Sequence, residues 1–150
     1  MIQQAVTELS HLYDADETAW LEAMADLIQQ GRWDDLDYAH LKEYLSDMAR
    51  RDRREVKSRL TTLVAHVLKW VHQPDQRSKS RRGTIIEQRQ ELLDLVARGV
   101  LRNHAEAILT DAYAAGVERA AAETGLAAES FPEECPYTVE QLLSPDFPSA

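Results

Sequence analysis

Glycine and proline occupy so few positions in this chain that long helices dominate what it can form. Among 150 residues there are five glycines and five prolines, and four of the prolines lie in residues 126–150. Glycine commonly stands just beyond the end of a helix, and a proline keeps the preceding residue out of helical geometry. The intervals between these residues therefore delimit the helices that we expect.

The first half of the chain contains two such intervals. One helix is expected to begin near Asp14, which has the capping-box spacing to Glu17, and to end at Gly31. The next segment begins at residue 34 or 37 and runs to residue 73, where Pro74 stops it. The charged sequence ARRDRRE interrupts its apolar stripe, and a helix of about forty residues is long for a globular domain. We therefore expect a bend or break near residues 50–54.

The second half predicts two further helices and a tail. Residues 80–98 form the third helix, whose inward side chains are expected to be Ile85, Leu92, Leu93 and Val96. The fourth runs from residue 101 or 102 to residue 124. Its inward face is rich in small residues, which permit a close approach of another helix: Ala105, Ile108, Leu109, Ala112 and Gly116. The proline-containing tail, residues 126–150, is expected to be irregular, with a short helix at 139–143.

Strand patterns are missing, because no run of β-branched residues alternates with polar ones. We therefore predict one all-α domain over residues 1–150, a helical bundle of about four main helices with the tail packed on its surface. The amino-terminal residues have no basic start and no apolar core, and the apolar runs are too short to span a membrane. With one cysteine, Cys135, which excludes an internal disulfide, these features predict a cytoplasmic protein without a membrane span.

Charge is unevenly distributed along the chain. Residues 1–49 carry two basic and eleven acidic groups, residues 50–89 carry twelve and four, and residues 90–150 carry three and eleven, for a net charge of −9. This basic middle either packs beside the acidic ends of the same chain or forms a surface for a partner, nucleic acid included. The candidate basic patch consists of Arg50, Arg51, Arg53, Arg54, Lys57, Arg77, Lys79, Arg81 and Arg82.

One arginine is predicted to face the core. On a helical wheel Arg89 falls within the stripe formed by Ile85, Leu92 and Val96, where a guanidinium needs a carboxylate or carbonyl partner. We expect the carboxylate of Glu55 or Glu43 to fill that role, although Arg89 can also extend to solvent. A candidate polar network of two helix faces is formed by Glu55, Arg59, His66, Trp70, Gln88 and Arg89.

Motifs for catalysis or metal binding are missing from the sequence. The histidines make no HExxH pair, and no phosphate-binding glycine loop or GxSxG elbow occurs. The acidic neighbour of Cys135, Glu134, disfavours a reactive thiolate. We therefore predict no catalytic residue, no metal ligand and no cofactor.

Three stretches resemble a bacterial family known only as domain of unknown function twenty-nine: YDADETAWLEAMADLIQQGRWDDLD, LVAHVLKWVHQPDQRSKSRRGTIIEQR and ETGLAAESFPEECPYTVEQLL. The middle stretch is the most specific of the three. The resemblance covers nearly the whole chain and implies a helical fold. It brings no activity, substrate or cofactor.

Three functions therefore remain open. The favoured one is a non-enzymatic helical module that binds a protein partner, which an exposed apolar groove would support. The alternative is a weak nucleic-acid-binding or antitoxin-like regulatory protein, which a continuous exposed basic face would support. The least favoured is an enzyme that uses His66, Glu55 and Arg89 in an interhelical cleft.

Overall fold

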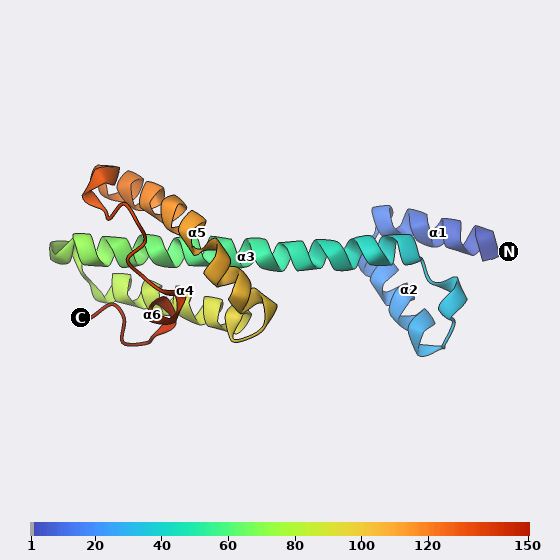
Figure 1. The fold of residues 1–150 in the computed structure, drawn as a ribbon. Helices are drawn as coiled ribbons and strands as arrows, with labels where there is room; N and C mark the ends of the chain where they lie inside the picture. The colour runs from blue at the N-terminus through green and yellow to red at the C-terminus, as the bar shows by residue number, and fades with distance from the viewer. Residues whose placement is uncertain (1) are drawn as a thin grey trace. The chain divides into compact units, whose positions relative to one another are not determined.

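The chain is helical throughout. The computed structural model describes the backbone of residues 2–150 and the side chains of residue 5 and residues 7–150. Figure 1 follows the helices in order: α1 (Ile2–Ala15), α2 (Glu17–Gln29), α3 (Tyr38–His72), α4 (Lys79–Val96), α5 (Val100–Thr124) and α6 (Val139–Leu143). Short 3₁₀ turns lie at Trp33–Asp35, Pro74–Gln76 and Ala128–Ser130. Because residues 2–150 contain no strand, the all-α prediction is confirmed.

The internal contacts of the chain divide it into two compact units, Met1–Arg50 and Arg51–Ala150. They are called the first unit and the second unit below, and each is described by itself. That the chain forms a single domain stays a prediction.

The first unit contains a helix that the sequence analysis missed. Asp14 lies inside α1, and the cap of α2 is Asp16, whose carboxylate accepts a hydrogen bond from the backbone N–H of Ala19 at 3.1 Å. The predicted start near Asp14 was therefore wrong, because the capping-box spacing pointed to an acid two residues too early. Gly31 follows α2 with a φ of 69°, a left-handed conformation that glycine adopts without strain, as predicted.

The core of the first unit is small. Its buried apolar side chains are Trp20, Met24, Leu27 and Leu36. Partly buried residues surround them: Leu9, Leu12, Tyr13, Leu21, Leu41 and Tyr44. Asp37 caps α3, since its carboxylate accepts from the backbone N–H of His40 at 3.4 Å.

The helix α3 runs from Tyr38 to His72 without interruption, so the predicted break near residues 50–54 was wrong. Arginine and glutamate are good helix formers, and pairs such as Arg50 with Asp47 at 2.8 Å and Arg59 with Glu55 at 3.7 Å support the helix locally. The charged stretch instead coincides with the boundary between the two units. The loss of apolar periodicity near residues 50–54 therefore reflects the boundary between the two units, and the helical backbone continues through it.

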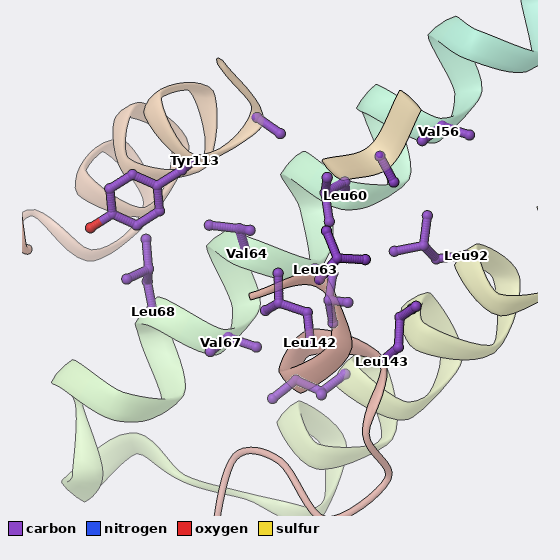
Figure 2. Close-up of a cluster of buried hydrophobic side chains, with 14 of the residues drawn as sticks. Val56, Leu60, Leu63, Val64, Val67, Leu68, Leu92, Tyr113, Leu142 and Leu143 are labelled. Carbon is purple, nitrogen blue, oxygen red and sulfur yellow. The ribbon is translucent and has the colours of Figure 1, made fainter. Parts of the chain in front are cut away.

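The core of the second unit is built from four helices. In Figures 1 and 2 the second half of α3 lies between α4 and α5, and α6 adds side chains to the same cluster. The buried members include Leu60, Leu63, Val64, Val67, Leu68, Ile85, Leu92, Val96, Ala112, Tyr113, Leu142 and Leu143. Leu93, predicted to point inward, is 37% exposed, because it lies one helical step beyond the buried stripe.

Small residues bring α5 close to α3. A Cβ built on Gly116 would lie 2.7 Å from Cγ1 of Val64, which is fully buried. The predicted close approach on the small-residue face of α5 is therefore present. The predicted short helix at residues 139–143 is also present as α6, with Thr138 and Gln141 forming a reciprocal capping box.

Candidate functional site

Arg89 is buried in the second unit and binds the backbone of the C-terminal segment. Its side chain, on a residue only 3% exposed, donates through Nε to the carbonyl of Leu142 at 3.0 Å and through Nη2 to the carbonyl of Phe147. The inward position was predicted, but the expected pairing with Glu55 or Glu43 was wrong. The Leu142 carbonyl lies at the end of α6, where helix carbonyls lack partners within the helix, and the guanidinium satisfies it.

Two further side chains hold the same segment. The indole Nε1 of Trp70, near the end of α3, donates to the carbonyl of Ser149 at 3.0 Å. Nη1 of Arg82, from α4, donates to the carbonyl of Pro148 at 2.6 Å. Consecutive carbonyls from residue 147 to residue 149 thus receive donors from Arg89, Arg82 and Trp70. These three residues form a clamp, called the tail clamp below.

Arginines also surround the indole of Trp70. The guanidinium carbons of Arg77 and Arg82 lie 5.2 and 5.6 Å from the ring centroid, within the range of cation–π attraction. Arg77 donates through Nε to the carbonyl of Trp70 at 2.9 Å, and Arg81 donates through Nη1 to Oε1 of Gln73 at 3.1 Å. This end of the second unit is therefore rich in positive charge.

The predicted basic patch falls into two groups. Arg77, Lys79, Arg81 and Arg82 lie around the start of α4. The other group, Arg50, Arg51, Arg53, Arg54 and Lys57, is exposed along α3. Trp70 lies thirteen positions beyond Lys57 on α3, which corresponds to about 20 Å at 1.5 Å per residue. The two groups therefore lie at different points of the fold.

The predicted polar network also separates into parts. Arg59 contacts Gln88 at 3.5 Å, Glu55 at 3.7 Å and Glu91 at 3.7 Å, and these groups are partly exposed to solvent. Trp70 and Arg89 belong to the tail clamp instead. The helical periodicity predicted which side chains share a face of one helix, but it did not predict which of them contact each other across helices.

His66 lies beside an ion network that the sequence analysis missed. Lys69 of α3 contacts Glu123 of α5 at 2.7 Å, and Arg119 contacts the same carboxylate at 2.9 Å. Hydrogen bonds from these two cations lower the pKa of Glu123 to about 2. Burial, with the charges of Lys69 and Arg119, lowers the pKa of His66 to about 4. The i,i+4 spacing of Arg119 and Glu123 was the only sequence signal for this network.

The first unit holds a second cluster that was missed. Trp20 donates through Nε1 to Oδ2 of Asp37 at 3.1 Å, and the same oxygen lies 2.8 Å from Nδ1 of His40. Tyr13 stacks on His40 with ring centroids 4.2 Å apart. Ser10 Oγ lies 3.3 Å from Nδ1 of His40 as well. A catalytic triad needs serine and aspartate on opposite ring nitrogens, so this trio joins helices and does not activate a nucleophile.

A groove of about 910 Å³ lies between α5 and the segment that follows it. Its lining includes Tyr113, Phe131 and Cys135, with the carboxylates of Glu133 and Glu134. Burial raises the pKa of the Cys135 thiol, so the neutral, weakly nucleophilic form predominates near pH 7. The groove is acidic but carries no activated group.

The described residues contain neither a metal-binding cluster nor a membrane-spanning helix. Across the described part of the chain, histidine, cysteine, aspartate and glutamate side chains nowhere gather in the threes that would hold an ion. Within residues 2–150 no helix is both long and apolar enough to cross a bilayer.

Comparisons with known proteins identify one family. The searches of curated proteins and of solved structures found no match. The model of the family described as Domain of unknown function DUF29 matches residues 12–148. This range contains α2 to α6, the three side chains of the tail clamp, and Tyr13, Trp20, Asp37 and His40 of the first unit. The chain therefore belongs to the DUF29 family.

Proposed function

We propose that this protein is a non-enzymatic helical module that binds a protein partner through the first unit. One observation carries the proposal: Trp33, Tyr38 and Leu45 are 56%, 58% and 61% exposed. These three residues are called the docking face below. Large aromatic side chains are costly to leave in water, and tryptophan and tyrosine dominate the binding energy of many interfaces.

The docking face is supported by local structure. Tyr38 and Leu45 are seven residues apart on α3, so they project from the same side of the helix. The hydroxyl of Tyr38 donates to the carbonyl of Trp33 at 2.6 Å, which fixes the turn before α3. A preordered aromatic pair loses little conformational entropy on binding.

Charge indicates the chemistry of the partner. Residues 1–49 carry eleven acidic and two basic groups, and Asp34 lies exposed beside Trp33. A partner with an apolar patch bordered by lysine or arginine complements such a surface. Cytoplasmic location is part of the proposal, because Cys135 has no second cysteine with which to form an internal disulfide.

A partner capture tests the docking face. The chain is used as bait in lysate from its native host, and the triple variant Trp33→Ala/Tyr38→Ala/Leu45→Ala is compared with wild type. The matched control is Ile86→Ala/Leu93→Ala, which removes exposed apolar side chains from α4. We expect a specific stoichiometric partner that the triple variant loses and the control retains. A partner that binds all three proteins equally would overturn the proposal.

Nucleic-acid binding is the second candidate, because Arg53, Arg54 and Lys57 are exposed on α3. Such binding would be insensitive to sequence and would weaken steeply with salt, since phosphate contacts release counterions. The variant Arg53→Glu/Arg54→Glu would abolish it. Unchanged binding of duplex DNA by this variant at low salt would exclude these residues as the contact.

A further inference from the structure

The start of α4 concentrates positive charge where a helix disfavours it. Residues 77–82 read RSKSRR, and the first turn of α4 contains no acidic residue. The helix macrodipole places partial positive charge at this end, so cations here raise the electrostatic free energy. Such local conflicts between sequence and structure are expected at functional or strained sites.

The contacts of these cations leave their charge uncompensated. Arg77, Arg81 and Arg82 donate to neutral oxygens, which are two backbone carbonyls and the side-chain amide of Gln73. Among the ion pairs formed by the described residues, none includes these arginines or Lys79. By contrast, Arg102 and Arg119 each pair with a glutamate one turn away.

The positive groups are close together. Arg77 and Arg82 both lie within 5.6 Å of the Trp70 ring centroid. Arg82 and Arg89 donate to the adjacent carbonyls of Pro148 and Phe147, and the pKa of Arg89 is lowered first by burial and then by the charge of Arg82. Arg77 and Lys79 are exposed, and Arg81 and Arg82 are half-buried, so the cluster is open to a ligand from solution.

From this arrangement we propose that Arg77, Lys79, Arg81 and Arg82 bind a small polyphosphate-bearing anion. These four residues are called the arginine site below. Each guanidinium uses one nitrogen in the hydrogen bonds given above, and its planar fork matches phosphate oxygens. Lys79 adds an exposed point charge at the first residue of α4. A bound polyphosphate would neutralise charge that this end of the helix otherwise leaves unpaired.

Calorimetry with inorganic pyrophosphate and tripolyphosphate tests the arginine site on the full chain. The site variant is Arg77→Gln/Arg81→Gln. The matched control is Arg53→Gln/Arg54→Gln, which removes the same charge from the exposed basic run of α3. We expect tripolyphosphate to bind the wild type, the site variant to bind at least about tenfold more weakly, and the control to change affinity by less than about twofold.

The indole signals provide a second readout. The chain has three tryptophans, and the Trp70→Phe variant identifies the N–H resonance of Trp70. Tripolyphosphate should shift this resonance and leave those of Trp20 and Trp33 in place. If the double variant fails to fold, Lys79→Gln alone, at an exposed position, should weaken binding by about threefold to tenfold.

Three results would overturn the proposal. The first is no binding of either polyphosphate at low salt. The second is an equal loss of affinity in the site variant and the control, which would indicate diffuse charge attraction. The third is binding of duplex DNA without binding of tripolyphosphate, which would make the cluster a nucleic-acid contact.

Discussion

The two units of the chain stabilise their helices in different ways. The first buries Trp20, Met24, Leu27 and Leu36 and joins its helices through the carboxylate of Asp37. The second buries apolar side chains from four helices and uses Arg89 to fasten its C-terminal segment. A unit of about fifty residues can bury only a limited fraction of its surface. The difference teaches that the first unit joins its helices through a buried carboxylate, whereas the second fastens its C-terminal segment through hydrogen bonds from Arg89 to backbone carbonyls.

Removing Arg89 should have the largest effect on the second unit. Arg89→Ala deprives the carbonyls of Leu142 and Phe147 of their charged donor and leaves a cavity, so we expect a loss of about 3–4 kcal/mol in the free energy of unfolding. Denaturant unfolding measures it. The control Arg102→Ala removes an exposed pair with Glu106 and should cost less than about 1 kcal/mol. Equal midpoints for the two variants would refute the clamp.

The close packing of α3 against α5 at Gly116 can be tested by adding a methyl group there. In Gly116→Ala the new Cβ would meet Val64 and the carbonyl of Thr61, so we expect a loss of about 2 kcal/mol. Gly83→Ala is the matched control, because open space surrounds that position inside α4. It should stabilise the protein by up to about 1 kcal/mol. Thermal melts in which both alanines act alike would contradict the packing described.

The contacts of Asp37 with Trp20 and His40 in the first unit are expected to stabilise the protein less than Arg89 does. Asp37→Ala leaves the buried indole N–H of Trp20 without its acceptor, at a cost of about 2 kcal/mol. Near-ultraviolet circular dichroism should show the altered setting of Trp20. Asp47→Ala, which removes the exposed pair with Arg50, should stay within about 0.5 kcal/mol of wild type. An equal loss of unfolding free energy in both variants would show that the hydrogen bond from Trp20 to Asp37 does not stabilise the first unit.

The smallest effect concerns pH. His66 has a folded-state pKa of about 4, below its ordinary 6.5, so the unfolded chain takes up a proton first as pH falls. The contribution of neutral His66 to the free energy of unfolding is present above pH 6.5 and is lost as the pH falls toward 4. His66→Gln should therefore flatten the fall in urea midpoint between pH 6.5 and about 5, a window above the titration of Glu123. The control His11→Gln, at an exposed position, should keep the wild-type slope.

Sequence predicted the fold best where one residue decides the backbone. Pro74 and Gly125 end their helices as expected, since each acts through its own conformational limits. The missed α1 and the unbroken α3 show the weakness of apolar pattern alone. A charged interval such as residues 50–54 continues a helix whenever its residues are good helix formers.

The candidate site was harder to predict. Periodicity placed Arg89 inside, because burial follows from the helix on which it lies. It could not identify the partner, since Leu142 and Phe147 offer backbone carbonyls that any residue would carry and that lie more than fifty positions away. The cluster of Asp37 and His40 was missed for a related reason, because its other members, such as Trp20, come from helices distant in the sequence.

Native-state hydrogen exchange tests the contrast between the two units most directly. Amides of α3 from Val56 to Leu68 should exchange only through global unfolding, with the highest opening free energies in the chain. Amides of α2 should open at a free energy at least about 1–2 kcal/mol lower, because fewer buried side chains hold them. Equal protection of α2 and of residues 56–68 would contradict the claim that the second unit has the larger and more stable core.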